Sequence, residues 1–198
     1  MQEFFQTIIQ TIDYNSPVIL TFVIVSFFVL VLNGITNGKA NRMFFSIYRS
    51  SLLSPLTWIR FFTHVLGHSS LTHYIENMMM ILLIGPAVEA KYGSCTLIQM
   101  IAAAALITGL VHFIFFPNAS LRGASGIVYM LISLSSAANF SDGKIPLTFL
   151  LVAFLYLGKE IYNALFHHDN ISQLTHIIGA VLGIVYLLYF QGILVLPF

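Results

Sequence analysis

Charged residues and cysteine are scarce in this sequence. Only 8% of its 198 residues are Asp, Glu, Lys or Arg, and the formal net charge is +1. So few cations, scattered along the chain, form no basic stripe that could follow a phosphate backbone, and we therefore expect no nucleic-acid partner. Cys95 is the sole cysteine, which excludes an internal disulfide and a cysteine-based metal cluster.

Apolar residues are correspondingly abundant. They make up 58% of the chain, and the mean hydropathy is +0.91, whereas soluble domains are about half apolar and about a quarter charged. Runs such as IAAAALITGLVHFIFF at 101–116 are long, and they do not alternate as the strands of a membrane barrel would. The sequence therefore predicts an all-α membrane protein.

The apolar runs are long enough for six transmembrane helices, because a helix needs about 20 residues to cross about 30 Å of hydrocarbon. These helices are expected at 17–35, 72–90, 95–116, 125–140, 145–163 and 172–191. We predict a short N-terminal tail at 1–16 and a single membrane domain at 17–198. The first apolar run is too long for a cleaved signal peptide, so we interpret it as a retained helix.

A long polar segment, residues 38–71, separates the first two predicted helices. It contains the four cations Lys39, Arg42, Arg49 and Arg60. It is too polar to span a membrane and too long for a tight turn. We expect a partly structured loop at the membrane interface.

The sequence GASG at 123–126 stands where a predicted loop becomes a helix. Gly123 and Gly126 allow close backbone approach, and Ser125 would lie near a helix N-terminus. Unpaired N–H groups there favour negative charge on a nucleophile or an oxyanion. A serine that only caps the helix, with glycines that only allow packing, is the alternative.

A histidine in the last apolar helix offers a base for that serine. His176 precedes Gly179 and Gly183, a small-residue stripe that lets another helix approach closely. Neutral His176 can take the Ser125 proton and return it to a leaving amine, or it can be a histidine simply hydrogen-bonded in the bundle. Tyr129, one turn after Ser125, can pack on the imidazole or belong to the core.

Two further polar residues share a face of the second predicted helix. His73 and Asn77 lie one turn apart and point two hydrogen-bond donors in one direction, as an oxyanion hole requires. An interhelical polar contact is the alternative. Glu76 lies on a different part of the helix circumference, where an ion pair with a loop residue, snorkelling to the interface and a protonated side chain are the alternatives.

These clusters together resemble the rhomboid family of intramembrane serine proteases, from about Trp58 to the C-terminus. The matching motifs are H-x(3)-H-x(4)-H-x(3)-N from His64 to Asn77, then EAKYG, GASGIVY and HIIGAVLG. The resemblance implies a six-helix rhomboid-like bundle that hydrolyses peptide bonds in or near transmembrane helices of membrane-protein substrates. It implies no cofactor and no metal.

The resemblance also implies residue roles. Ser125 is then the nucleophile, His176 the general base and acid, and the oxyanion hole comprises His73, Asn77 and the Ser125 backbone amide. The supporting residues it implies are Gly123, Gly126, Tyr129, Gly179, Glu89 and Arg60, with Glu89 expected to organise a loop. The family's adjacent Trp-Arg pair is replaced here by Trp58-Ile59-Arg60, which is a departure from the family's pattern in that loop.

The expected location is the cytoplasmic membrane of a bacterial-type cell, with several passes through the bilayer. The family topology places both termini in the cytoplasm. The positive-inside rule prefers the reverse orientation, because the family topology would place most of the Lys and Arg residues outside. These cations are Lys39, Arg42, Arg49, Arg60 and Arg122.

Two rival functions remain. A non-cleaving rhomboid-like protein that binds membrane clients would share the fold, but it should lack the nucleophile or the base, and both are present here. A metal-dependent membrane protein could use histidines, although the HExxH motif is absent. The histidines available for it are His64, His68, His73, His112, His167 and His168.

Overall fold

The computed structural model describes residues 14–136, 147–166 and 170–194, and these residues are helical apart from turns and one isolated β-bridge. The long helices are α2 (Pro17–Ile35), α5 (Leu71–Tyr92), α6 (Ser94–Phe115), α7 (Ser125–Ser136), α8 (Leu147–Phe166) and α9 (Asn170–Phe190). The prediction of an all-α protein is therefore confirmed for the described residues.

Four stretches are long and apolar enough to cross a membrane, namely Pro17–Ile35, Leu71–Tyr92, Ser94–Phe115 and Ser172–Phe190. Several passes through a bilayer follow from them. The described part of α7 is shorter, from Ser125 to Ser136, and the predicted helix end at 140 lies outside the described residues. The count of six spans stays a prediction.

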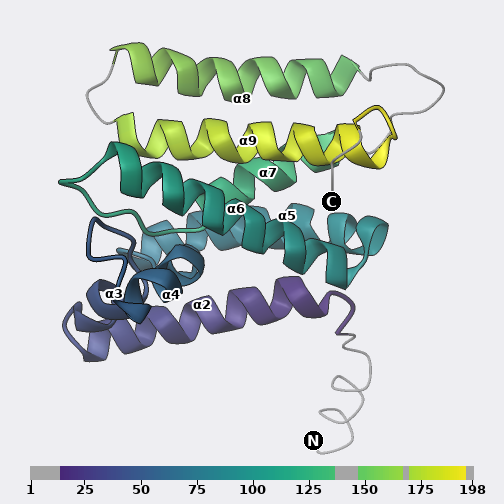
Figure 1. Ribbon diagram of the computed structural model, residues 1–198. Helices are drawn as coiled ribbons and strands as arrows, with labels where there is room; N and C mark the ends of the chain where they lie inside the picture. The colour runs from purple at the N-terminus through teal and green to yellow at the C-terminus, as the bar shows by residue number, and fades with distance from the viewer. Residues whose placement is uncertain (1–13, 137–146, 167–169, 195–198) are drawn as a thin grey trace, which may run out of the picture.

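The polar segment between α2 and α5 folds into short helices joined by turns. They are α3 (Lys39–Phe44), α4 (Pro55–Thr63) and the 3-10 turn η1 (His64–Leu66). Pro55 occupies the first position of α4, where its missing N–H costs nothing. Figure 1 shows this group beside α2 and α6. Its position at a membrane interface stays a prediction.

The core of the bundle is centred on α7. This helix packs against α5, α6, α8 and most extensively against α9. Its apolar side chains Ile127, Met130, Leu131 and Leu134 are at most 1% exposed. In Figure 1, α8 lies beside α9 at one edge of the bundle, and α2 lies at the opposite edge. The side chains of α7 are thus surrounded by other helices on several sides.

Glycines set the distance between α7 and α9. A Cβ added to Gly179 would lie 2.1 Å from the carbonyl oxygen of Gly126, and one added to Gly183 would lie 2.5 Å from that of Met130. Neither position can hold a larger residue without moving a backbone. The predicted close approach along the glycine stripe is therefore present, and it brings His176, one turn before Gly179, towards the start of α7.

The loop that leads into α7 is tied to the segment before α4. Ile47 and Leu121 form an antiparallel bridge in which each backbone N–H donates to the other's carbonyl at 2.9 Å. Gly123 N–H donates to the carbonyl of His64 at 3.0 Å. These three hydrogen bonds fix the backbone immediately before Ser125.

Candidate active site

Ser125 opens α7. The carbonyl of Ala124 accepts from Val128 N–H, so Ser125 lies in the first turn, where backbone N–H groups have no partner within the helix. Gly123 has φ +124°, which an L side chain rarely adopts. The glycine therefore permits the sharp entry that places Ser125 at the helix start.

Ser125 and His176 line one cavity of about 460 Å³. The cavity lies between α5, α7 and α9, and the loop before α7 forms part of its wall. Its lining residues are His73, Glu76, Asn77, Met80, Leu121, Arg122, Ser125, Val128, Tyr129, Ile132, Ser172 and His176. All four residues predicted to act in catalysis or oxyanion binding thus face the same space.

The imidazole of His176 is stacked on the ring of Tyr129. The ring centroids are 4.3 Å apart, and the ring planes differ by 9°. Tyr129 lies one turn after Ser125 on α7, while His176 belongs to α9. The contact therefore holds the histidine ring against the helix that carries the serine.

His73 and Asn77 converge on the loop before Ser125. A Cβ added to Gly123 would lie 2.9 Å from His73 Nε2 and 3.9 Å from Asn77 Nδ2. Asn77 Nδ2 donates one hydrogen to the His73 carbonyl at 3.0 Å, which orients the amide. Ser69 Oγ lies 3.1 Å from His73 Nδ1 and fixes the ring from the other side.

Glu89 is not among the residues that line this cavity, and it caps a helix. Its carboxylate oxygens accept from Val18 N–H at 3.0 Å and from Ile19 N–H at 3.1 Å, in the first turn of α2. Ser94 Oγ donates to the same carboxylate at 2.7 Å, across the turn between α5 and α6. Glu89 is 4% exposed, and its charge is stabilised by these donors and by the helix dipole.

Arg60 also lies outside the cavity, in α4. It is 4% exposed, stacks over the Tyr48 ring at 4.3 Å and donates to the Tyr48 hydroxyl. It also donates to Ser50 Oγ at 2.8 Å and to Thr57 Oγ1 at 3.1 Å. Arg60 thus organises the segment between α2 and α5 from within.

His64 and His68 are buried beside the loops rather than in the cavity. His64 Nδ1 lies 3.1 Å from the Arg60 carbonyl, and His68 Nδ1 lies 3.1 Å from the Leu66 carbonyl. Burial lowers the pKa of His64 to about 4 and that of His68 also to about 4. Both rings are therefore neutral hydrogen-bonding groups at physiological pH.

A metal centre would need several ligands in one place. Among the described residues, no group of three His, Cys, Asp or Glu side chains converges in that way. His112 is buried, and its Nε2 lies 3.1 Å from the Ala119 carbonyl. His167 and His168 lie outside the described residues.

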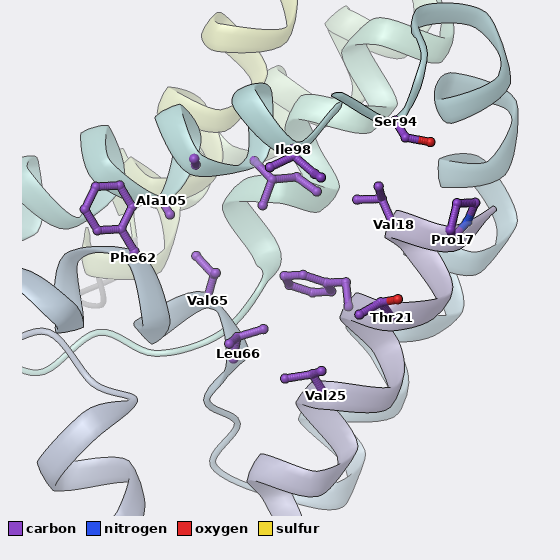
Figure 2. Close-up of a pocket in the computed structure, with 13 residues that line it drawn as sticks. Pro17, Val18, Thr21, Val25, Phe62, Val65, Leu66, Ser94, Ile98 and Ala105 are labelled. Carbon is purple, nitrogen blue, oxygen red and sulfur yellow. The ribbon is translucent and has the colours of Figure 1, made fainter. Parts of the chain in front are cut away.

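A larger cavity, of about 600 Å³, lies elsewhere, between α2, α6 and the α4–η1 region. Figure 2 shows its wall of apolar side chains, with Val25, Leu66 and Ile98 among them. Its hydroxyl-bearing residues are Thr21 and Ser94, the Ser94 hydroxyl is engaged by the helix-capping carboxylate of Glu89, and the residues that line this cavity include no histidine. The smaller cavity that holds Ser125 and His176 is therefore the candidate active site.

Comparison with known proteins identifies a family. Residues 55–192 match the Rhomboid domain family, a region that includes Ser125, His176, His73 and Asn77. The chain belongs to the rhomboid family.

Three relatives illustrate how distant the matches to this rhomboid are. The rhomboid protease GluP of Bacillus subtilis (strain 168) is 25% identical over 159 residues, covering 79% of this chain and 31% of GluP. Rhomboid-related protein 2 of Mus musculus is 27% identical over 166 residues, covering 73% of this chain and 55% of that protein. The rhomboid protease GlpG of Salmonella choleraesuis (strain SC-B67) is 38% identical over 73 residues, covering 37% of this chain and 26% of GlpG. This chain therefore spans 55% or less of each relative.

Some residues that shape the rhomboid cavity escaped the sequence reasoning. Arg122 and Ser172 line it, and Ser69 contacts His73. Ser172 precedes His176 by four residues within α9, so helical spacing could have indicated it, whereas Ser69 precedes the N-cap Ser70 and lies outside α5. Arg122 directly precedes the GASG motif, but nothing in the sequence showed that the loop turns it inwards.

Proposed function

We propose that this rhomboid is an intramembrane serine protease in which Ser125 is the nucleophile and His176 is the general base. The observation that carries the proposal is that Ser125 and His176, from different helices, line one cavity while Tyr129 holds the imidazole. A serine needs such a base, because its hydroxyl is a weak nucleophile while protonated.

The chemistry follows from the positions of these groups. Neutral His176 accepts the Ser125 proton as Oγ attacks the scissile carbonyl carbon, and an acyl-enzyme forms when the protonated histidine gives that proton to the leaving amine. Water, activated by the same histidine, then hydrolyses the ester and regenerates Ser125. The water-accessible cavity of about 460 Å³ supplies space for this second step.

The oxyanion of the tetrahedral intermediate is assigned to three donors. His73 Nε2 and Asn77 Nδ2 both approach the backbone at Gly123, two residues before Ser125, and the Ser125 amide lies in the first turn of α7. A Ser69 hydroxyl that donates to His73 Nδ1 leaves Nε2 protonated and able to donate. Asn77 keeps a second amide hydrogen free for the same purpose.

The proposed substrates are membrane proteins cut in or near a transmembrane helix. The cavity lies among helices that are apolar enough to cross a bilayer, so a substrate can reach it from the membrane. A peptide bond within an intact helix is shielded by its own hydrogen bonds, and the substrate must unwind locally before cleavage. Helix-weakening residues such as Gly and Pro in the substrate ease that step.

The proposal is tested by cleavage of a transmembrane reporter with a Gly-containing, helix-weakened segment, by purified protein in liposomes. Wild-type protein should cut the reporter, and Ser125→Ala and His176→Ala should each lower kcat by at least about a thousandfold. Ser135→Ala is the matched control, because its hydroxyl donates to its own helix at Ile132 O and it does not line the cavity. Retained cleavage in folded Ser125→Ala would contradict the proposal, whereas binding of the reporter without any cleavage would favour a client-binding protein.

A further inference from the structure

A second pocket lies beside the candidate active site and shares Arg122 with it. The second pocket has a volume of about 420 Å³. We call it the arginine pocket, and it is lined by Gly38, Arg42, Ser46, Tyr48, Ser120 and Arg122. Arg122 also lines the cavity of Ser125 and His176. A ligand bound to Arg122 would therefore contact the chain three residues before the proposed nucleophile, Ser125.

The floor of the arginine pocket is built on the bridge between Ile47 and Leu121. Both side chains of the bridge point into the core, where Ile47 is 0% and Leu121 is 8% exposed. Neighbouring side chains on extended backbone point to opposite faces. The residues that flank the bridge and line the pocket are Ser46, Tyr48, Ser120 and Arg122. The backbone hydrogen bonds of the bridge thus join the residues that line the pocket to the loop that leads to Ser125.

The charge of the pocket is positive and unbalanced. Arg42 is exposed and Arg122 is partly buried, and within the described part of the chain neither guanidinium has a hydrogen bond or an ion pair. No Asp or Glu is among the residues that line the pocket, and Glu76 lines the catalytic cavity that Arg122 shares. Arg60 adds a further positive charge behind Tyr48, to whose hydroxyl it donates.

A buried hydroxyl in the pocket also lacks a partner. Ser46 is 2% exposed, and its Oγ makes no hydrogen bond to any described residue. A polar group buried in this way is costly unless a ligand or water satisfies it. Two unpaired guanidinium groups and an unsatisfied hydroxyl together fit an anion with several acceptor oxygens, as a carboxylate has.

We propose that the arginine pocket binds the side chain of an Asp or Glu in the substrate, a few residues from the scissile bond. This inference rests on the proposed protease activity. A substrate segment that lies extended in the catalytic cavity passes Arg122 on its way to the pocket, and a planar guanidinium matches a carboxylate in two parallel hydrogen bonds.

A membrane phospholipid is a poorer fit for the pocket than a substrate carboxylate. A phosphate headgroup would bring acyl chains that need an apolar groove, and no aliphatic side chain lines the arginine pocket. The large apolar cavity in Figure 2 is lined by other residues, such as Phe62 and Val65. Substrate binding therefore accounts better for the position and the polarity of the arginine pocket.

The test uses a series of reporters with Asp or Asn at each position around the cleavage site. At one position, kcat/KM for the Asp reporter should exceed that for the Asn reporter by about tenfold, chiefly through KM. Arg42→Gln should bring the Asp value down to the Asn value. Arg49→Gln is the matched control, because Arg49 is an exposed cation of the same segment that does not line the pocket. Arg42→Glu should reverse the preference, so that a Lys reporter is favoured.

Three results would overturn the inference. The first is that no position shows a preference for Asp over Asn. The second is that the Asp preference survives in Arg42→Gln. The third is that Arg42→Gln lowers cleavage of Asp and Asn reporters equally, and only in phosphatidylglycerol vesicles. The last result would assign the pocket to a lipid phosphate. The affinities of Asp and Asn reporter peptides for Ser125→Ala protein test the pocket separately from the protease activity. Tighter binding of the Asp peptide would support the pocket, and equal binding would contradict it, even if wild-type protein cuts nothing.

Discussion

The ring of Tyr129 lies flat on the imidazole of His176, with centroids 4.3 Å apart and planes that differ by 9°. The two rings come from α7 and α9, which meet at glycines with no space for a side chain. The stacked ring restricts the rotation of the imidazole and keeps it beside the helix that begins at Ser125. A base held in one orientation loses less entropy on reaching the transition state.

Replacement of Tyr129 tests this positioning role. Tyr129→Ala should lower kcat by about tenfold, because the imidazole gains rotational freedom and loses a stacking contact worth about 1 kcal/mol. Tyr129→Phe keeps the ring and should retain most of the activity. Reporter cleavage by the two variants, with thermal unfolding as the check on folding, provides the measurement. Equal activity of Tyr129→Ala and wild type would show that the stack does not position the base.

Gly179→Ala should destabilise the bundle and abolish most of its activity. The added Cβ would lie 2.1 Å from Gly126 O, so α7 and α9 must separate, at a cost of about 1–3 kcal/mol. The matched control is Gly158→Ala in α8, where the added Cβ meets nothing within 4 Å. Thermal unfolding in detergent should show a lower Tm for the first variant and an equal or higher Tm for the second. A normal Tm for Gly179→Ala would contradict the observed helix contact.

Glu89→Gln should lower stability without acting on the chemistry. The neutral amide keeps only one acceptor oxygen for three donors, Val18 N–H, Ile19 N–H and Ser94 Oγ. We expect a loss of about 1–3 kcal/mol, seen as a lower Tm, with kcat unchanged below the unfolding temperature. Glu76→Gln is the stability control, because Glu76 is exposed and makes no such contacts. A fall in kcat at full folding would show that Glu89 acts on the active site.

Acid should destabilise the protein through His64 and His68. Burial lowers the pKa of each from 6.5 to about 4. The unfolded chain takes up these protons near pH 6.5, and the folded chain does so only near pH 4, so stability falls as the pH drops through that window. The pKa difference of each histidine lowers the free energy of unfolding by at most about 3 kcal/mol across this pH range. Tm measured against pH should fall less steeply for His64→Asn than for wild type, and parallel curves would contradict this assignment.

Much of the helical architecture could be predicted from the sequence, because membrane helices must be long and continuously apolar. The predicted starts of the helices at 17 and 125 agree with α2 and α7. The glycine stripe after His176 predicted a close helix contact, and Gly126 is the partner that the structure reveals. Hydropathy could not predict the short helices α3 and α4, because they have only 6 and 9 residues, far fewer than a membrane span, and their packing depends on distant contacts.

The candidate site was predictable in its residue types but not in its surroundings. Ser125, His176, His73 and Asn77 stood out because polar groups within apolar helices are costly. The pairing of Ile47 with Leu121 joins segments far apart in the chain, and no periodic pattern announces it. The position of Arg122 between two pockets depends on that pairing, and therefore only the structure could reveal it.

Covalent trapping of Ser125 tests the central claim most directly, because it needs no choice of substrate. A fluorophosphonate reacts with an activated serine, whose Oγ attacks phosphorus and displaces fluoride. Peptide mass spectrometry of the folded protein in liposomes should find the phosphonyl group on Ser125 in wild type. It should find far less in His176→Ala and none in Ser125→Ala, with Ser135→Ala labelled like wild type. Labelling that is absent from Ser125, or equal in His176→Ala and wild type, would contradict the serine–histidine dyad.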